Sequence, residues 1–201
     1  MKKILVLALA VVLLFFYASN SNAITIGFDP VTQDVTLGDQ ALIDLVISDL
    51  GDGTAPSLGA FDLDISYDSA ILAFDSFAFG DPVLGDQLDL WGLGSLIDVD
   101  SSTPGTVNLF ELSLDLPFDL EDFQADSFTL ATLTFDTLSV GASSLDIFTN
   151  SLSDAWGDSL IATTESGNIN VASAPVPEPA TLLLLGSGLA GIGFFRRRKT
   201  S

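Results

Sequence analysis

Hydrophobic and polar residues alternate strictly in one central segment of the chain. From Phe61 to Tyr67 (FDLDISY), every odd position holds a large apolar residue and every even position holds Asp or Ser. A period of two is typical of a β-strand that turns one face to a core and the other to solvent. The segment therefore predicts a half-buried strand.

Six further segments have strand-like composition, and clusters of Gly, Asp, Ser and Pro separate them, as in 49–54 and 101–105. The six segments are Ile24–Phe28, Gln40–Ser48, Val107–Leu114, Phe128–Phe135, Leu145–Phe148 and Asn168–Val171. No helical period is evident between them. Residues 24–172 therefore predict an all-β fold, a β-sandwich of the jelly-roll type with about seven to nine strands.

One stretch, Asp75 to Asp100, is rich in apolar residues but lacks clean alternation. It fits either an extra hairpin or a long ordered loop. Its Trp91, like Trp156 further on, could form a platform that stacks on sugars. The interpretation we favour is that the two tryptophans plug the ends of the sandwich.

The N-terminus has the three parts of a secretory signal peptide. Two lysines precede an uninterrupted apolar run from Ile4 to Phe16, and small residues follow up to Ala23. An uncleaved anchor helix is the alternative, but it needs about 20 apolar residues. We expect residues 1–23 to be a signal peptide, helical in its apolar part, that signal peptidase removes after Ala23.

The C-terminus has a second targeting pattern. Residues 173–177 form a linker of small residues and proline, and residues 180–195 predict a transmembrane helix that is short for a bilayer. A polar motif precedes the helix: Val176, Pro177, Glu178 and Pro179. A basic cluster follows it: Arg196, Arg197, Arg198 and Lys199. Because basic residues flanking a membrane helix stay in the cytoplasm, the sandwich is expected outside the inner membrane.

The charges are strongly segregated. All six basic residues lie in the two terminal segments, whereas all but one of the 27 acidic residues lie between residues 24 and 175. That region has no Lys, Arg or His, so it cannot form a side-chain salt bridge. It also cannot neutralise phosphates, which excludes nucleic acid as a partner.

The residue types exclude most catalytic chemistry. The chain has no His and no Cys, so zinc sites and Ser-His-Asp or Cys-His catalysis are excluded. A pair of carboxylates that hydrolyses a glycosidic bond remains a remote alternative. No acidic pair has a distinctive sequence context, and we predict that the protein is not an enzyme.

Calcium is a more suitable partner for the carboxylates, because it binds six to eight oxygen ligands and is available outside the cell. Candidate ligands are Asp62 with Asp64 and Asp98 with Asp100, since each pair projects from one side of its chain. A solvated acidic face is the alternative for either pair. We expect a divalent ion to offset the self-repulsion of this acidic region.

Three motifs resemble the cohesin-like β-sandwich: the turn 34–39 (DVTLGD) before an alternating strand, the run 59–72 (GAFDLDISYDSAIL), and the segment 128–135 (FTLATLTF). Residues 167–171 (GNINV) fit its last strand. Members of that family are non-catalytic modules that bind other proteins or belong to cell-surface assemblies, and some relatives bind carbohydrate. The resemblance therefore implies adhesion or scaffolding and names no ligand.

The order of motif, apolar helix and basic cluster over 177–199 resembles the PEP-CTERM sorting signal of Gram-negative bacteria. The resemblance implies processing near Pro177–Pro179 by an exosortase, a membrane transpeptidase. It also implies a temporary inner-membrane anchor, followed by delivery to the cell surface or the exopolysaccharide matrix. A plain anchor helix would explain the apolar run and the arginines, but not the Pro-Glu-Pro motif.

Taken together, the patterns predict an exported, non-catalytic surface or matrix protein with an adhesive or structural sandwich. Its expected partners are exopolysaccharide or surface proteins. The alternative is a carbohydrate-binding module of the exopolysaccharide matrix.

Overall fold

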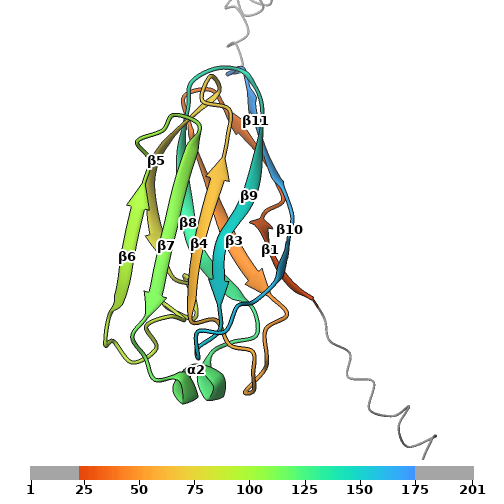
Figure 1. Cartoon of the computed structure of the whole chain (residues 1–201). Coiled ribbons are helices and arrows are strands. Elements are labelled where there is room, and N and C mark those ends of the chain that lie inside the picture. The colour runs from red at the N-terminus through yellow and green to blue at the C-terminus, as the bar shows by residue number, and fades with distance from the viewer. Residues whose placement is uncertain (1–22, 175–201) are drawn as a thin grey trace, which may run out of the picture.

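Residues 23–174 are described in the computed structural model and form two β-sheets packed face to face (Figure 1). The five-stranded sheet has the order β10 (Ala162–Thr164), β1 (Ile24–Asp29), β3 (Gln40–Ser48), β8 (Phe128–Thr137) and β5 (Leu72–Phe79). The six-stranded sheet has the order β2 (Thr32–Thr36), β11 (Gly167–Ala172), β9 (Gly141–Ser153), β4 (Ala60–Ser66), β7 (Thr106–Ser113) and β6 (Ser95–Asp100). The predicted all-β sandwich is confirmed.

Each of the seven predicted strands is present in the structure, but the described residues contain eleven strands rather than seven to nine. Two of the additional strands, β2 and β10, are short edge strands that pair in parallel with β11 and β1. All other pairs are antiparallel. The two short strands consist largely of polar residues, so the hydrophobic pattern did not reveal them.

The stretch 75–100 is not a hairpin. Its first residues belong to β5 in one sheet and its last residues to β6 in the other, and the ordered loop 80–94 connects them. The carboxylate of Asp81 organises the start of this loop by accepting hydrogen bonds from the Val83, Leu84 and Thr129 amides. Burial raises the pKa of Asp81, but these hydrogen bonds outweigh it and the pKa is lowered overall.

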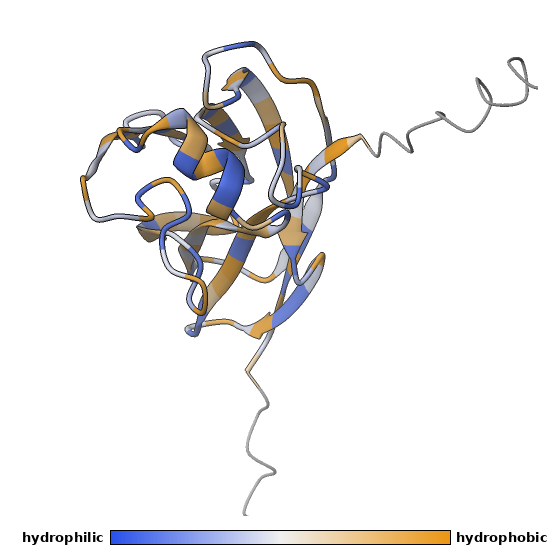
Figure 2. Ribbon diagram, turned by 90° about the horizontal axis from the view of Figure 1, so that it is seen from below, coloured by the Kyte–Doolittle hydropathy of each residue, from blue (hydrophilic) through white to orange (hydrophobic). Residues whose placement is uncertain are grey.

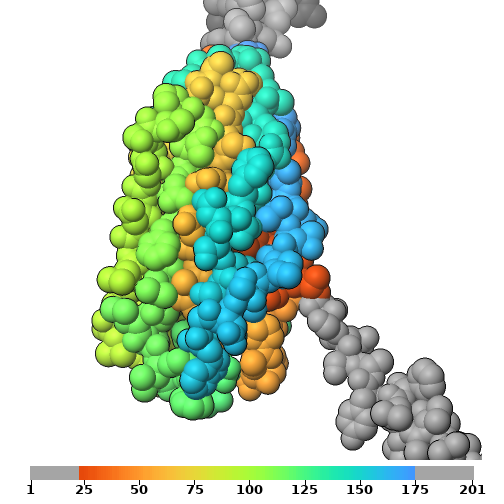
Figure 3. All heavy atoms as spheres, in the orientation of Figure 1, coloured from red at the N-terminus to blue at the C-terminus, as the bar shows by residue number. Residues whose placement is uncertain are grey.

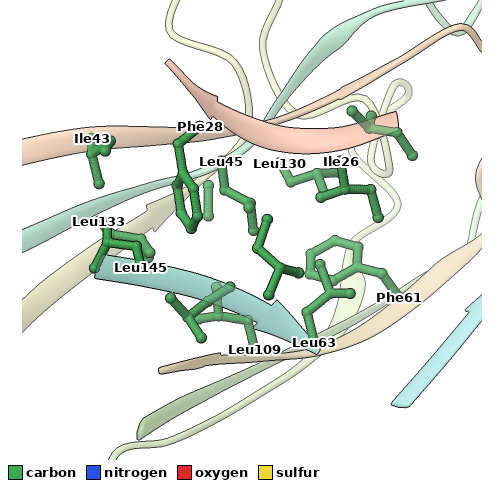
Figure 4. Packing of buried hydrophobic residues seen from close by; sticks show 14 of the residues in the cluster. Ile26, Phe28, Ile43, Leu45, Phe61, Leu63, Leu109, Leu130, Leu133 and Leu145 are labelled. Carbon is green, nitrogen blue, oxygen red and sulfur yellow. The ribbon is translucent and has the colours of Figure 1, made fainter. Parts of the chain in front are cut away.

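The core lies between the inner faces of the two sheets, where the alternating apolar residues meet (Figure 4). Ile26, Ile43, Leu45 and Leu133 project from one sheet, and Phe61, Leu63, Leu109 and Leu145 project from the other. Each inward position alternates with a more exposed one, for example in β4. This pattern is the physical basis of the strand predictions.

A short helix, α2 (Pro117–Phe123), corrects the expectation that the central region has no helix. Pro117 opens it, where the missing amide costs no hydrogen bond, and Leu120 is its buried residue. Seven residues make only two turns, which is too short for a helical period to appear in the sequence.

The helix lies at one end of the sandwich and β11 ends at the other (Figure 1). The chain therefore leaves the domain toward residue 175 from the end opposite α2. At the α2 end, the segment after β9 lies against the helix, as Figure 3 shows and as a Trp156–Glu121 hydrogen bond requires.

Candidate functional site

Asp62 and Asp64, two of the predicted calcium ligands, lie on the outer face of β4. The side-chain amide of Asn108 on β7 donates to an oxygen of each carboxylate, at 2.7 Å and 2.8 Å. Asn150 donates a third hydrogen bond, to Asp62 at 3.2 Å. Both acids are thus held at fixed positions by neutral amides.

Asp98 and Asp100 lie on the edge strand β6, opposite Phe110 and Asn108 of β7, respectively. The structure therefore brings both predicted pairs to one face of the six-stranded sheet. A hydrogen bond from the Ser102 amide lowers the pKa of Asp100. Within residues 23–174, no group of three or more acidic side chains has the spacing of a metal site. Calcium binding by either pair stays a prediction.

Both tryptophans lie at the α2 end, and neither plugs the sandwich. The side chains of Trp91 and Trp156 are 57% and 52% exposed. Trp91 packs edge to face on Phe123, with ring centroids 5.8 Å apart, and Trp156 packs in the same way on Phe118 at 4.8 Å. The favoured interpretation is wrong, because loops and α2 close this end and carry the rings outward.

These four residues, Trp91, Phe118, Phe123 and Trp156, form two ring pairs, one at each end of α2, and we call them together the aromatic end patch. In α2 only Leu120 is buried, so Phe118 and Phe123 face outward. The neighbouring Leu93, Leu114 and Leu116 are also exposed. Viewed from this end, apolar and polar segments alternate around the helix (Figure 2). Sequence reasoning identified the tryptophans but not their phenylalanine partners, because α2 was not predicted.

Two buried glutamines hold the loops beneath the patch. Gln124, at the C-terminus of α2, accepts from the Leu58 amide at 2.6 Å and donates to the carbonyls of Leu58 and Gln87 at 3.0 Å and 2.9 Å. Gln87 accepts in turn from the Ala125 amide at 3.0 Å. The loops before β4 and before β6 are thereby joined to the helix.

Beside these glutamines lies a group of four acids that we call the buried acidic cluster after its two buried members, Glu111 and Asp115. It consists of Asp86 and Asp89 in the loop 80–94, Glu111 on β7, and Asp115 before α2. The sequence analysis did not name Glu111 as a site residue. Its spacing from Val107 and Leu109 is nevertheless that of an inward-facing position, so the alternation along the strand predicts that its side chain lies in the core. No sequence signal marks Asp115.

The buried members of the cluster have shifted pKa values. Burial, together with the nearby Asp86 and Asp89 carboxylates, raises the pKa of Glu111 from 4.5 to about 7, against the opposite effect of a hydrogen bond from Ser95. Burial also raises the pKa of Asp115, although the amides of Leu90 and Trp91 favour its charged form. The neutral form of each acid is therefore favoured more than in water.

The predicted sorting motif (Val176–Pro179) and the basic cluster (Arg196–Lys199) lie outside the described residues, as do the signal peptide up to residue 22 and the predicted helix 180–195. Among residues 23–174, no helix is long and apolar enough to cross a membrane. Ala23 is exposed, and β1 begins at Ile24, directly after the expected cleavage point.

Comparisons with known proteins agree with both resemblances. Residues 175–199 match a family described as the PEP-CTERM protein-sorting motif. No curated protein matches the chain significantly in sequence.

Solved cohesins have a similar fold. A cohesin of Clostridium acetobutylicum, determined in solution, is 21% identical with a TM-score of 0.57, over 78% of this chain and 96% of the cohesin. A non-cellulosomal cohesin of the archaeon Archaeoglobus fulgidus is 17% identical with a TM-score of 0.55, over 76% and 93% of the chains. A type I cohesin from a cohesin–dockerin complex of Clostridium thermocellum is 14% identical with a TM-score of 0.59, over 75% and 100%.

The fold thus defines the class of the domain, a cohesin-like β-sandwich. The chain is a PEP-CTERM protein in which this domain precedes the sorting motif.

Proposed function

We propose that this protein is an exported, non-catalytic adhesion module that its C-terminal motif delivers to the cell surface or extracellular matrix, where the aromatic end patch binds partner proteins. The observation that carries the proposal is the position of the patch. It lies at the end of the domain opposite the exit toward the sorting motif (Figure 1). While the tail is in the membrane, the patch therefore faces away from the chain's point of attachment.

The composition of the patch supports binding of a protein. Clustered exposed apolar side chains on a soluble domain mark interaction sites, and Trp and aromatic residues are enriched among the energetically dominant contacts. Acidic residues lie near the ring-bearing residues in the chain: Asp119, Glu121 and Asp122 in α2, and Asp154 and Asp158 in the turn after β9. Of these, Glu121 accepts a hydrogen bond from the Trp156 ring at 2.7 Å. A partner with a basic rim around an apolar centre fits this surface best. Cohesins such as that of Clostridium thermocellum are found in complexes with dockerins, which is a precedent for protein binding by this fold.

Replacing Trp91 and Trp156 together by serine is expected to weaken binding to envelope and matrix proteins of the producing bacterium by at least about tenfold, because truncated aromatic anchors typically cost that much. Binding is measured by surface plasmon resonance on fractionated surface proteins. The matched control is Phe148→Ser, which removes a ring that is 59% exposed on β9, away from α2. Loss of binding in the control, with the double variant unaffected, would transfer the site to the sheet face.

A carbohydrate-binding module is the second candidate, because the exposure of Trp91 makes its ring available to a sugar. The perpendicular rings in the two pairs, at 86° and 85°, do not form the flat row that would suit a polysaccharide chain. Binding to a glycan array that Trp91→Ala abolishes would favour this candidate over protein adhesion. No signal on a broad array that includes the native exopolysaccharide would count against it.

A carboxylate-dependent hydrolase has less support. The acids with raised pKa values, Glu111 and Asp115, are 0% and 7% exposed, so a polymeric substrate has no access to them. We therefore propose a binding function without catalysis.

The sorting step makes its own prediction. The mature protein is expected to begin near Ile24 and to end near Pro177–Pro179, after signal peptidase and an exosortase have acted. Intact mass spectrometry of the native protein from surface fractions measures both ends. A Pro177→Ala, Pro179→Ala variant should keep its full C-terminus and stay in the inner membrane. Retention of the complete tail by the wild-type protein would instead indicate a permanent anchor.

A further inference from the structure

The two inner members of the buried acidic cluster have carboxylate oxygens without partners. Glu111 is fully buried, and its Oε1 accepts a hydrogen bond from Ser95 at 2.6 Å, but its Oε2 has no hydrogen-bond partner. Asp115 is 7% exposed, and both of its carboxylate oxygens are buried without a hydrogen bond of normal geometry, although the Leu90 and Trp91 amides lie close enough to favour its charged form. Burying a polar atom without a partner is costly, so three such oxygens in one region require a physical explanation.

The remaining two acids increase the negative potential at the same place. Asp86 and Asp89 lie close enough to Glu111 to disfavour its charged form, and Asp89 acts on Asp115 in the same way. Asp89 is thus common to both buried acids. Four carboxylates from a loop, a strand and the segment before α2 converge here only because the chain folds.

The chain supplies no cation of its own to this cluster. Between residues 24 and 175 it has no Lys, Arg or His. A buried carboxylate elsewhere is normally paired with such a residue or with a metal ion. The negative charge of the cluster can therefore be offset only by protonation, as the raised pKa of Glu111 indicates, or by an external cation.

We infer that the buried acidic cluster of Asp86, Asp89, Glu111 and Asp115 binds a divalent cation, with calcium preferred. Calcium accepts a mixed set of carboxylate, hydroxyl and backbone oxygens in flexible geometry, whereas magnesium demands a near-ideal octahedron. The unpartnered oxygens of Glu111 and Asp115 and the Ser95 hydroxyl supply such ligands. This site is separate from the predicted pairs Asp62–Asp64 and Asp98–Asp100.

Binding involves a local rearrangement, since the acids do not already surround one point at metal-binding spacing. Asp86 and Asp89 are suited to this rearrangement because amides of their own loop fix their carboxylates. The Leu88 amide donates to Asp86 at 2.9 Å, and the Gly94 amide donates to Asp89 at 2.8 Å. Access from solvent exists beside Asp115, which lines a pocket of about 260 Å³ together with Leu120 and Trp156. The bound ion would tie the loop 80–94 to β7 and to the start of α2.

The test is thermal unfolding of the full chain in a non-ionic detergent, at pH 7.5, with a calcium chelator or with excess calcium. A hundredfold excess of calcium over its dissociation constant is expected to raise the Tm of the wild type by roughly 5 to 10 °C. Magnesium at the same concentration should give a smaller rise. Glu111→Gln and Asp115→Asn, which keep the side-chain volumes, should each lose most of the calcium-dependent rise.

The matched control is the double variant Asp62→Asn, Asp64→Asn, which removes two carboxylates from the exposed face of β4. This control should keep the full calcium-dependent rise in Tm, because that rise comes from binding at the buried acidic cluster and not from a general reduction of repulsion between acidic side chains. Terbium provides an independent readout, because Trp91 belongs to the loop that carries Asp89 and should sensitise its luminescence. Glu111→Gln should abolish that luminescence.

Either of two results overturns the inference: a wild-type Tm that calcium does not change, or a rise that both single variants keep in full. An equal rise with magnesium overturns the preference for calcium. Adhesion by the aromatic end patch is measured separately, with the tryptophan variants. The adhesion proposal can therefore be disproved while the cation site is confirmed, and the cation site can be disproved while adhesion is confirmed.

Discussion

In the presence of a chelator at pH 8, Glu111→Gln is expected to raise the free energy of unfolding by roughly 3 kcal/mol. The reason is the raised pKa of Glu111, about 7 in the folded state against an ordinary 4.5. Each pKa unit corresponds to about 1.4 kcal/mol, so ionising this buried acid opposes folding by that amount. Glutamine can still accept the Ser95 hydrogen bond, and its amide can donate to Asp86, the neighbouring carboxylate.

The pH dependence gives this prediction its sign. Below about pH 4 the acid is protonated in both states, so the wild type and the variant should unfold with similar free energies. Between pH 4.5 and 7 the folded state keeps a proton that the unfolded state releases, so the stability of the wild type falls as the pH rises. Above pH 7 the difference between the two proteins should be complete and constant.

Urea unfolding at several pH values measures the effect. Glu165→Gln is the control, since it makes the same chemical change at an exposed residue beyond β10. Its free energy of unfolding should differ from that of the wild type by well under about 1 kcal/mol. A Glu111→Gln variant whose stability parallels the wild type from pH 4 to 8 would disprove the predicted linkage.

Replacing Gln124 by methionine is expected to lower the free energy of unfolding by roughly 3 to 4 kcal/mol. Methionine fills a similar volume, so the loss comes from hydrogen bonding rather than from a cavity. The change leaves the amide and carbonyl of Leu58 and the carbonyl of Gln87 without a partner. Each buried group that loses its partner costs about 1 to 3 kcal/mol, and partial relaxation reduces the sum.

The control for this prediction is Gln40→Met on β3, where an exposed side chain makes one hydrogen bond, to Asp136 at 3.0 Å. Its cost should stay below about 1 kcal/mol, because water replaces the lost bond. Chemical denaturation of both variants in parallel measures the difference. Equal losses in the two variants would contradict the role assigned to Gln124 in joining the loops at the α2 end.

The local pattern was sufficient for most of the sheet structure. Side chains on a strand alternate between faces, so the apolar residues of β4 and β3 indicated both the strand and its buried side. The limits of these two predicted strands agree with the structure to within one residue. Elements without such a pattern were missed: β2 and β10 are mostly polar, and α2 has only two turns.

The candidate functional residues show the same division: some follow from the sequence, and others are evident only in the folded structure. The sorting motif is a contiguous stretch of chain, so residues 175–199 suffice for the match. The spacing of Asp62 and Asp64 likewise placed them correctly on one face. The orientation of the tryptophans did not follow from sequence, because it depends on how a loop, a turn and a short helix close one end.

The sequence by itself thus determined the all-β class, the C-terminal sorting motif and an acidic region without any basic residue, while the signal peptide stays a prediction. Those properties depend on composition and on neighbours along the chain. The tertiary structure alone decided the aromatic end patch and the buried acidic cluster. Their members come from the loop 80–94, β7, the α2 segment and the turn after β9, which are distant in sequence. Only the packing of the two sheets brings them to one end, and that packing leaves Glu111 and Asp115 buried without a counter-charge.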